Sequence, residues 1–590
     1  MKPITAILEE RISEEIKNAA NGEDLPAVVR PAGNPKFGDY QANGVMGAAK
    51  KLKTNPRQLA EKIVTNLDLS DICSKTEAAG PGFINLTLSQ NFIADRLRNM
   101  LEDCDNRLGI DEKEKPVRTV VDFSGPNIAK QMHVGHLRST IIGDCICRVL
   151  EFEGDKVIRQ NHIGDWGTQF GMLVIFLWQK IEELDSPEWT APPLEDLESF
   201  YKQASQKYKN DPDFAAKARD AVVGLHNGNK GLLELWKMIV AASEKHYQKL
   251  YDQLNINLKP ENIRGESAYK GDLPEIVKEF EDKGLASESD GAVCVFPEGF
   301  KNKDGEPLPL IIQKSDGGFL YATTDLAALK YRINELKAEK IIYVTDARQS
   351  LHFEMVFEAA RMAGWVTDDV QLEHITFGSV LGEDGKPLKT RSGENVKLKD
   401  LLDEAVKRAR NIVEQKNRDL PEDKKKQIAE AVGIGAVKYA DYSNNRTSDY
   451  IFSFDKMMAM DGNTAPYMQY AYARIKSIEK KAKQQGVEVE KELANIDKVD
   501  LSEPAELELA KHIIRYDQAI ESAGGDYRPN YLTEYLYELA QRFSSYYNHC
   551  PVIKADENKR PERLMLCRLT EKIIRHGLTK LLGINVVEQM

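Results

Sequence analysis

The sequence lacks the features that mark membrane-spanning, secreted and globally basic proteins. Its longest clean apolar run, residues 170–178, is nine residues long, whereas a membrane-spanning helix needs about twenty. The N-terminal segment carries charges throughout and contains no continuous apolar core of the kind that a signal peptide has. Positive charge is in the minority, because 81 Lys and Arg face 93 Asp and Glu and give a net charge of −12. This balance excludes a globally basic coat for nucleic acid but allows a local basic patch.

Cysteine pairs of the kind that hold zinc are also missing. The seven cysteines are scattered, at Cys73, Cys104, Cys145, Cys147, Cys294, Cys550 and Cys567. None lies in a C-x-x-C pair, and an odd, scattered set does not form a disulfide framework. We therefore expect reduced, buried thiols in a cytoplasmic protein, with no protein-bound metal site, no zinc and no prosthetic group. The pattern G-x-x-x-x-G-K-[ST] is absent too, which excludes a P-loop enzyme.

The order of helical and strand-like segments predicts a multidomain α/β protein, as expected for 590 residues. Residues 1–112 predict a small α+β domain. Residues 113–400 predict a domain with a Rossmann-like, doubly wound parallel sheet, interrupted at about 180–262 by a helical insertion. Residues 401–454 predict a helical junction, and residues 455–590 predict an all-α bundle.

The parallel sheet is predicted from a succession of strand, turn, helix and strand. A β-branched, apolar strand at 117–123 runs into the turn 124–127, and a helix at about 134–152 leads to a strand at 157–159. Further strands are expected at 308–313, 340–345 and 374–380, with helices at 325–336 and 351–363. Because the carboxyl ends of parallel strands meet at one edge, residues that follow these strands should line a common ligand-binding edge.

The strongest chemical signal is the segment K-Q-M-H-V-G-H-L-R-S at 130–139. His133 and His136 are three residues apart, so they share one face of the first helical turn. A helix N-terminus presents free N–H groups to anions, and Gly135 lets a base or a phosphate approach the backbone. Imidazoles placed there can donate hydrogen bonds to phosphate oxygens as charge develops in a transition state. Taken alone, the pattern also fits two ordinary histidines at a helix start, or a metal pair.

A second cationic element follows the strand predicted at 374–380. The segment G-K-P-L-K-T-R-S-G at 385–393 contains Lys386, Lys389 and Arg391. Taken alone, it fits a solvated basic hairpin. Together with the histidine pair, it places positive charge after two strands of one sheet, where both elements could grip a triphosphate. Attack at the α-phosphate needs such distributed charge, because negative charge spreads onto the leaving pyrophosphate.

The H-x-G-H pattern and the basic loop resemble those of class I aminoacyl-tRNA synthetases. The longer strings VDFSGPNIAKQMHVGHLRST, NHIGDWGTQFG and NTAPYMQYAYARI closely resemble the arginyl-tRNA synthetase family, and the resemblance covers essentially the whole chain. It implies that L-arginine is activated with ATP, accompanied by Mg²⁺, to arginyl-adenylate and pyrophosphate. The arginyl group then passes to the 2′-hydroxyl of the terminal adenosine of tRNA(Arg). The resemblance also implies that activation needs bound tRNA, that 113–400 is the catalytic domain, and that 455–590 is an anticodon-binding bundle.

One departure from the family pattern concerns the basic loop, which in most class I enzymes contains a second, catalytic lysine. If Lys389 matches the first lysine, Ser392 stands at the second position. By the resemblance, Lys130 takes over this role, and an ammonium group can reach phosphate from either side. The expected catalytic residues are His133, His136, Lys130 and Lys389. The expected ATP-binding residues are Asn127, Met132, His133, Val134, Gly135, His136, Leu137, Arg391 and Ser392.

A pocket for a guanidinium group follows from the residues as well. A guanidinium has five fixed donors and a permanent charge, so it pairs best with a carboxylate beside an aromatic wall. Tyr321 and Asp325 are four residues apart at a predicted helix start, and Asp122 ends the first strand. By the resemblance, these three recognise the arginine side chain, while Asn127 and Gln349 position its α-amino and α-carboxyl groups.

The segment H-I-G-D-W-G-T-Q at 162–169 stays open between two interpretations. It fits a tight structural turn in which Trp166 fills the core. It equally fits an element on the nucleotide side of the site, in which His162 and Gln169 contact the substrate.

Aromatic and polar residues alternate in the C-terminal third of the chain, where unpaired RNA bases could stack on exposed tyrosines. Each tyrosine could equally be a core residue. From this alternation, the expected tRNA-binding residues are Tyr439, Asn444, Arg446, Tyr467, Gln469 and Arg474. Residues 551–580 contain eight Lys or Arg against four Asp or Glu, which suits phosphate contact but also fits a solvated helix face. Residues 34–43 would contact the outer corner of the tRNA.

Two other interpretations compete with an arginine-charging enzyme. One is a non-catalytic RNA-binding relative, which the intact histidine pair and pocket carboxylates disfavour. The other is a class I enzyme for another amino acid, which Tyr321, Asp325 and Asp122 disfavour, as do the missing zinc cysteines for a cysteine enzyme. The expected partners are ATP, L-arginine and tRNA(Arg), with no membrane and no stable protein partner, and the protein is expected to be a monomer.

Overall fold

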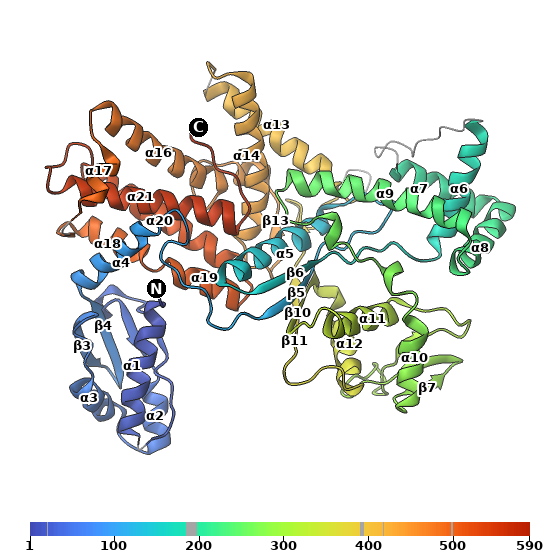
Figure 1. Cartoon of the computed structure of the whole chain (residues 1–590), viewed down its shortest axis with the longest axis horizontal. Helices are drawn as coiled ribbons and strands as arrows, with labels where there is room; N and C mark the ends of the chain where they lie inside the picture. The colour runs from blue at the N-terminus through green and yellow to red at the C-terminus, as the bar shows by residue number, and fades with distance from the viewer. Residues whose placement is uncertain (21, 185–196, 390–394, 417, 497–498) are drawn as a thin grey trace. The chain divides into compact units, whose positions relative to one another are not determined.

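The computed structural model describes residues 1–590 with the exception of 21, 185–196, 390–394, 417 and 497–498. Its contacts divide the chain into two compact units, each described by itself (Figure 1). The central unit comprises Lys113–Ala459 and Leu581–Asn585. The terminal unit comprises Met1–Glu112, Met460–Lys580 and Val586–Met590. The two ends of the chain therefore fold into one unit, although the central unit separates them in the sequence.

The central unit is built on a four-stranded parallel sheet in the order β11-β10-β5-β6. Its strands are β5 (Arg118–Asp122), β6 (Lys156–Gln160), β10 (Lys340–Asp346) and β11 (Gln371–Phe377). Helix α5 (Val134–Glu153) connects β5 to β6, and α12 (Ser350–Met362) connects β10 to β11. Because the two connections run in opposite directions along the sheet, right-handed crossovers place the helices on opposite faces. The predicted doubly wound sheet is confirmed, and its order reverses between β5 and β10, where such sheets bind ligands.

The sheet is stable because the apolar side chains of its strands are buried. Val120 of β5 and Ile341 and Tyr343 of β10 lie in one core with α10 (Leu273–Asp282), α11 (Tyr321–Asn334) and α12. Burying an aliphatic side chain of this kind contributes roughly 1.5–3 kcal/mol. This core anchors the strand ends and helix starts that carry the candidate site.

One predicted strand does not belong to the parallel sheet. The strand expected at 308–313 is β9 (Leu310–Gln313), which pairs antiparallel with β8 (Ala292–Val295) in a separate sheet with β7 (Ala286–Ser289). Its side chains alternate between buried and less buried positions, and Ile311 is 37% exposed. Such a strand suits an antiparallel sheet with one solvated face, whereas strands of a doubly wound sheet are buried on both faces. The residue types of β9 do not show this alternation.

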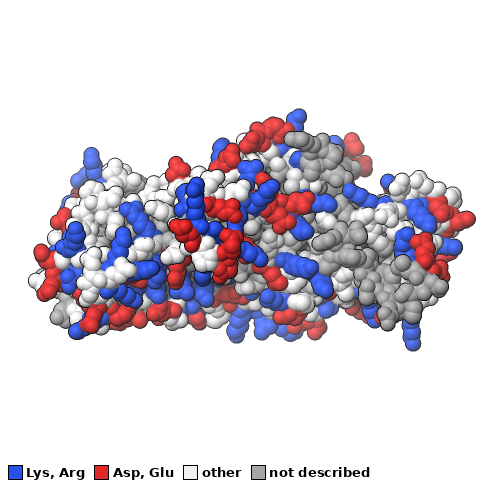
Figure 2. Space-filling view, turned by 90° about the horizontal axis from the view of Figure 1, so that it is seen from above, with Lys and Arg blue, Asp and Glu red and all other residues white. Residues whose placement is uncertain are grey.

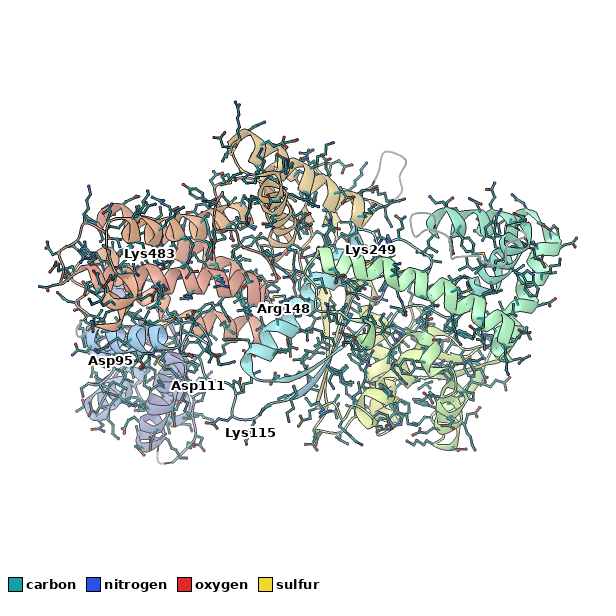
Figure 3. The ribbon with its side chains drawn as sticks, turned by 45° about the horizontal axis from the view of Figure 1, so that its top comes forward. Asp95, Asp111, Lys115, Arg148, Lys249 and Lys483 are labelled. Carbon is teal, nitrogen blue, oxygen red and sulfur yellow. The ribbon has the colours of Figure 1, made fainter. Side chains whose placement is uncertain are left out.

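A helical insertion follows β6 and precedes α10 (Figure 1). It consists of α6 (Gln169–Leu184), α7 (Leu197–Asn210), α8 (Pro212–His226) and α9 (Lys230–Gln253). Figure 3 labels Lys249 near the end of α9 and Arg148 on α5. Arg148 donates its Nη2 to the carbonyl of Asn255, just beyond α9, over 2.7 Å. The end of the insertion is thus tied to the helix that follows β5.

Helices α13 (Leu398–Lys416) and α14 (Glu422–Tyr442) also belong to the central unit. The Tyr442 hydroxyl donates to the Ile141 carbonyl of α5 over 2.9 Å. Asp441 pairs with the fully buried Arg138 of α5 at 3.0 Å, and a buried cation needs such a partner. The segment predicted as a helical junction therefore packs on the sheet domain.

The terminal unit joins an α+β domain to a helical bundle. The α+β domain has an antiparallel sheet in the order β1-β2-β4-β3, which consists of β1 (Val29–Pro31), β2 (Tyr40–Ala42), β3 (Cys73–Ala79) and β4 (Phe83–Leu88). Its helices are α1 (Ile4–Ala19), α2 (Val45–Leu52), α3 (Pro56–Asn66) and α4 (Gln90–Glu102). The bundle contains α16 (Ala465–Gln484), α17 (Val489–Ala494), α18 (Pro504–Ile513), α19 (Tyr516–Gly525), α20 (Asn530–His549) and α21 (Arg560–His576). Helix α4 packs against α18 and α21.

A buried carboxylate links the two parts of the terminal unit. Asp39 is 6% exposed and accepts a hydrogen bond from the Leu88 backbone over 2.9 Å. Its other oxygen lies 2.9 Å from Lys511 Nζ of α18. Arg515 Nη2 donates to the Asp39 carbonyl over 3.0 Å. The α+β domain is therefore docked on the bundle through buried charged groups.

None of the helices in the part of the chain that the structure describes has a stretch long and apolar enough to cross a membrane.

Candidate active site

The N-terminus of α5 orients both histidines of the H-x-G-H segment. His133 is the N-cap residue, and its Nδ1 accepts a hydrogen bond from the Gly135 backbone over 3.0 Å. His136 Nδ1 accepts one from the His133 backbone over 3.2 Å. These bonds satisfy N–H groups that a helix start leaves free, and they place the two ring centres 4.0 Å apart. The helix start therefore fixes the direction in which both rings present their Nε2 atoms.

Both imidazoles are neutral near pH 7. Burial lowers the pKa of His136 to about 3, and the neighbouring charges of His133 and Lys130 act in the same direction. Burial also lowers the pKa of His133, helped by the charges of Arg348 and Lys130. Because each Nδ1 accepts a hydrogen bond, the single proton of each neutral ring resides on Nε2. The pair thus offers two N–H donors without carrying positive charge.

Gly135 has a role that the sequence did not reveal. A Cβ atom at this position would lie 2.8 Å from Cε1 and 2.9 Å from Nδ1 of His133. Any side chain here would displace the His133 ring from its cap position. Glycine is therefore needed for the histidine geometry, as well as for the approach of a ligand to the exposed backbone.

The structure brings the described ends of the basic loop next to this helix start. Lys389 pairs with Asn395 in a β-bridge. Directly after it, Val134 N donates to the Val396 carbonyl over 3.0 Å, and Leu398 N donates to the Met132 carbonyl over 2.9 Å. The two cationic elements expected from the sequence are thus neighbours. Arg391 and Ser392 lie outside the described residues.

Lys130 is exposed and lies on the turn before the histidines. Its Nζ lies 5.5 Å from the centre of the Tyr201 ring in α7. Its positive charge contributes to the lowered pKa of both His133 and His136, three and six residues further along the chain.

Asp325 occupies the centre of the candidate amino-acid pocket. Its Oδ2 lies 2.6 Å from His352 Nε2, and its Oδ1 lies 4.0 Å from His162 Nε2. Tyr321, one turn earlier on α11, is 64% exposed, and its ring stands edge-on to His352 with 4.9 Å between the ring centres. Tyr321 is therefore accessible to solvent, whereas the Asp325 carboxylate lies beside two histidines.

Glu266 is a candidate pocket residue that the sequence analysis did not single out. It begins the short 3-10 helix Glu266–Tyr269 that contacts α11. Burial raises the pKa of its carboxyl group to about 8, and the charges of Asp325 and Asp165 raise it as well. Asp165 in turn accepts hydrogen bonds from the backbone and the hydroxyl of Ser267, over 2.8 and 2.6 Å. A carboxyl group held beside another carboxylate is suited to bind a cation. No periodicity or motif marks the segment G-E-S, so only the folded structure reveals this residue.

The expectation for Asp122 needs correction. Its carboxylate accepts a hydrogen bond from Nη2 of the buried Arg332 over 2.7 Å. Arg332 Nε also donates to Gln160 over 2.6 Å. Asp122 is thus already paired with a guanidinium of the protein itself, and it holds α11 on the sheet instead of facing a substrate.

Asn127 and Gln349 lie where the sequence analysis expected them, and both are exposed. Asn127 follows β5 and forms a bridge with Gly164, where a Cβ would lie 2.4 Å from Asn127 Oδ1. Gln349 precedes α12 at the carboxyl end of β10. Three expected ATP-binding residues, Met132, Val134 and Leu137, have buried side chains, so only their backbones could contact ATP.

The segment 162–169 has both structural and pocket roles. The Trp166 ring lies edge-on to Trp236 of α9 with 5.8 Å between ring centres. Trp236 Nε1 donates to the Asp165 carbonyl over 2.8 Å. Trp166 is therefore a packing residue, whereas His162 faces Asp325. Gln169 begins α6, and its side chain lies 3.5 Å from the Trp166 carbonyl.

Four of the six residues expected to bind tRNA serve the protein's own packing. Tyr439 and Gln469 have no exposed area, so no base can stack on them. Arg446 Nη1 donates to the Thr376 carbonyl over 2.7 Å, and Asn444 donates to the Ala440 carbonyl over 2.7 Å. The pattern of tyrosine and polar residues did not distinguish these interior contacts from an RNA-binding surface.

The other two, Tyr467 and Arg474, are partly exposed on α16. The Tyr467 ring lies 5.8 Å from that of Tyr537, and the Arg474 guanidinium lies 4.8 Å above the Tyr547 ring. Tyr470, on the same helix, is 42% exposed. We call these five residues the α16–α20 aromatic surface. It could accept stacked bases.

Most of the positive charge at 551–580 is already neutralised. Lys559, Arg560, Arg563, Arg568 and Lys572 form ion pairs with Asp500, Glu492, Glu506, Glu479 and Asp105 respectively. On the face that Figure 2 shows, Lys and Arg side chains alternate with Asp and Glu side chains. In the N-terminal segment 34–43, Asp39 is used for internal docking, whereas Phe37 is 48% exposed. The local excess of cations therefore overstates the charge available to phosphate.

Comparison with known proteins shows the family to which each part of the chain belongs. A family model described as tRNA synthetases class I (R), catalytic domain, matches residues 97–454, which contain the parallel sheet and both histidines. The central part of the chain is therefore a class I aminoacyl-tRNA synthetase domain. Models described as Arginyl tRNA synthetase N terminal domain and DALR anticodon binding domain match residues 6–88 and 468–590. The chain belongs to the arginyl-tRNA synthetase family.

Individual relatives match over their full length. The arginine–tRNA ligase of Hahella chejuensis is 50% identical over 99% of both chains, and that of Chromobacterium violaceum is 49% identical over 100% of both. Among solved structures, arginyl-tRNA synthetase from Plasmodium falciparum is similar with a TM-score of 0.85 at 32% identity, over 100% of both chains. The enzyme from Thermus thermophilus has a TM-score of 0.80 at 25% identity, again over 100% of both.

Proposed function

We propose that this protein is an arginine–tRNA ligase. It activates L-arginine with ATP to arginyl-adenylate, releases pyrophosphate, and transfers arginine to the 2′-hydroxyl of the terminal adenosine of tRNA(Arg). One observation carries the proposal: two neutral imidazoles that donate through Nε2 lie at the switch point of the sheet, in the same unit as a pocket with two carboxyl groups, Asp325 and Glu266. This set of groups suits a nucleotide together with a cationic amino acid.

In the first step, the carboxylate of arginine attacks the α-phosphate of ATP, and the bond to pyrophosphate breaks. His133 and His136 donate Nε2–H bonds to phosphate oxygens whose charge grows in the transition state. Lys130 and Lys389 neutralise the leaving pyrophosphate, with Arg391 and Ser392 of the basic loop as further contacts. Because the imidazoles are neutral, they stabilise developing charge without requiring a prior protonation.

The substrate guanidinium binds between Asp325 and Glu266, against the ring of Tyr321. Asp325 supplies a carboxylate that already lies beside His352 and His162, and Glu266 becomes ionised when the cation enters. Asn127 and Gln349, at the carboxyl ends of β5 and β10, position the α-amino and α-carboxyl groups. The exposed backbone around Gly135 receives the adenosine.

Mg²⁺ enters with ATP, bound to its phosphates. Within the described ranges, no three His, Cys, Asp or Glu side chains lie close enough together to hold a metal ion. The Mg²⁺ ion would add to the charge neutralisation that Lys130 and Lys389 provide.

The bundle of the terminal unit reads the anticodon through the α16–α20 aromatic surface, and Phe37 contacts the outer part of the tRNA. The family match of residues 468–590 to an anticodon-binding domain supports the first assignment. Bound tRNA is required for arginine activation. All seven cysteines are free in the structure, which suits the reducing cytoplasm, and the protein acts as a monomer.

Exchange of pyrophosphate into ATP tests this proposal. The exchange is measured with each amino acid, in the presence and in the absence of tRNA(Arg). Arginine alone among them should support exchange, and only with tRNA. Exchange with a neutral amino acid but not with arginine would overturn the specificity, and exchange without tRNA would overturn the tRNA requirement.

A further inference from the structure

The turn that carries Lys130 has a backbone conformation that needs outside support. Lys130 N donates to the Asn127 carbonyl over 3.3 Å and closes a tight turn. Ala129, at its third position, has a φ of 60°. This left-handed conformation favours glycine, because Cβ of any other residue crowds the backbone. A strained residue of this kind persists only where its surroundings hold it.

Helix α9 of the insertion provides this support through Tyr247. The Tyr247 side chain is 2% exposed. Its hydroxyl lies 2.5 Å from the Asn127 carbonyl oxygen and 3.1 Å from the Lys130 carbonyl oxygen. One buried hydroxyl proton is therefore shared between the first and the last residue of the turn. Its removal would leave both carbonyls without this donor.

Two further side chains of α9 hold the same loop. Ser243 Oγ accepts the Ala129 N–H over 3.1 Å. The Tyr251 hydroxyl lies 2.8 Å from Ser124 Oγ, and Ser124 also has a left-handed φ of 76°. Ser243, Tyr247 and Tyr251 are spaced four residues apart, so they lie on one face of α9. The helix thus holds both strained residues of the loop between β5 and α5.

The Lys130 side chain also meets the insertion. Its Nζ lies 5.5 Å from the centre of the Tyr201 ring in α7, within the range of a cation–π contact. The backbone of Lys130 is therefore held by α9 and its ammonium group by α7. Both helices belong to the insertion and not to the parallel sheet.

We propose that the helical insertion positions Lys130 for adenylate formation, with Tyr247 as a positioning residue that acts through the turn at residues 127–130. This inference rests on the proposed function, because it assigns a structural support to the lysine that neutralises the leaving pyrophosphate. It places control of the activation rate in an element that lies outside the nucleotide-binding sheet.

The first test compares Tyr247→Phe with Tyr442→Phe. Each change removes one buried hydroxyl that donates to backbone carbonyls of the central unit, but Tyr442 binds Ile141 in the middle of α5, away from the turn. We expect the single-turnover rate of adenylate formation to fall roughly tenfold or more in Tyr247→Phe, since small displacements of reacting groups are costly. The rate in Tyr442→Phe should stay within about twofold of that in the unchanged protein, because its contact at Ile141 is distant from the turn and sites so far apart rarely affect each other.

The affinity for arginine separates positioning of Lys130 from general damage. The guanidinium end of arginine binds α11 and the segment around Glu266, which Tyr247 does not contact. Tyr247 does hold the carbonyl of Asn127, which we assign to the α-amino group, so Tyr247→Phe should weaken arginine binding by that one contact only and should lower the rate far more. An equal loss of rate and of arginine affinity would overturn the assignment to Lys130. Equal rates in Tyr247→Phe and Tyr442→Phe would overturn it as well.

A double-mutant cycle with Lys130→Ala tests whether Tyr247 acts through the lysine. When the Lys130 ammonium group is absent, Tyr247 can no longer affect the rate through it. In the Lys130→Ala background, Tyr247→Phe should therefore lower the single-turnover rate by less than about twofold. If the rate loss of the double variant equals the product of the losses of the two single variants, the proposal is contradicted. All variants are compared with the unchanged protein, whose exchange activity with arginine is established first. Absence of that activity would count against the proposed function, whereas normal activity with multiplying losses would count only against the role of Tyr247.

Discussion

At the scale of single residues, the site uses opposite pKa shifts for two tasks. Burial keeps His133 and His136 neutral, so that Nε2–H can donate to an anion. Burial beside Asp325 keeps Glu266 protonated until a cation arrives. The histidine pair thereby donates hydrogen bonds without carrying positive charge, and the guanidinium side avoids two unpaired carboxylates.

Arginine binding should depend on pH through Glu266. Its pKa is raised to about 8 in the empty pocket, whereas a bound guanidinium favours the ionised form, so binding releases a proton. Affinity should therefore rise with pH by up to about tenfold per unit below pH 8 and level off above it. Calorimetry in buffers of different ionisation enthalpy measures the released proton. Glu266→Gln should abolish both the proton release and this part of the pH profile, and an unchanged profile would remove Glu266 from the pocket.

Replacement of Gly135 by alanine should impair activation without unfolding the helix. The added Cβ would meet the His133 ring, and loss of one donor to a developing charge costs about 10²–10³-fold in rate. Thermal stability should change little, since the helix propensity that alanine gains over glycine, about 1 kcal/mol, offsets the loss of the His133 cap.

Gly47→Ala is the matched control for this change. Gly47 lies inside α2, and a Cβ there would meet nothing within 4 Å. We expect a higher melting temperature and an unchanged rate of adenylate formation. A Gly135→Ala protein that activates arginine at the normal rate would show that the His133 cap is dispensable.

At the scale of elements, the ion pair of Asp122 and Arg332 holds α11 against β5. Both side chains are buried, and removal of one partner leaves the other charge without compensation. Asp122→Ala should lower the free energy of unfolding by about 3–5 kcal/mol, as measured by denaturant titration. The folded fraction should bind arginine normally, because α11 presents Tyr321 and Asp325 from its opposite end. A stable Asp122→Ala protein with weak arginine binding would instead restore the role expected from the sequence.

The same pair shows where prediction from sequence ended. Strands, the doubly wound sheet and the histidine pair follow from local patterns, because burial periodicity and helix-start chemistry depend on neighbouring residues. The partner of Asp122 is 210 residues away along the chain, and nothing near either residue announces the pair. A carboxylate at a strand end looks the same in sequence whether it faces a substrate or a distant arginine.

Glu266 and Tyr439 show two further ways in which local sequence fails to predict a site residue. Glu266 stands in a short turn without periodicity, so its place beside Asp325 depends on the fold of the insertion and of the segment after it. Tyr439 stands in an amphipathic-looking helix whose C-terminal half is covered on every face, since residues 431–439 of α14 are all buried. Helical spacing predicts that one face is buried, but not that the opposite face is buried too.

At the scale of the whole molecule, the terminal unit depends on contacts between segments from the two ends of the chain. Asp39 of the α+β domain faces Lys511 and Arg515 of the bundle, and Lys572 of α21 pairs with Asp105 beyond α4. Of these cations, only Lys572 belongs to residues 551–580. The other paired cations of that segment bind carboxylates of the bundle itself, so they stabilise the bundle and do not form an open basic surface.

Asp39→Asn should loosen the α+β domain from the bundle and leave the central unit intact. Asparagine can still accept the Leu88 N–H, but Lys511 loses its buried counter-charge, which should cost about 1–3 kcal/mol. Hydrogen exchange should then speed up in residues 1–112 and in α18, while the strands of the parallel sheet keep their protection. Asp24→Asn is the matched control, because Asp24 pairs with Lys17 in an exposed ion pair, and such pairs contribute little. Faster exchange throughout the parallel sheet would show that the two units do not unfold independently.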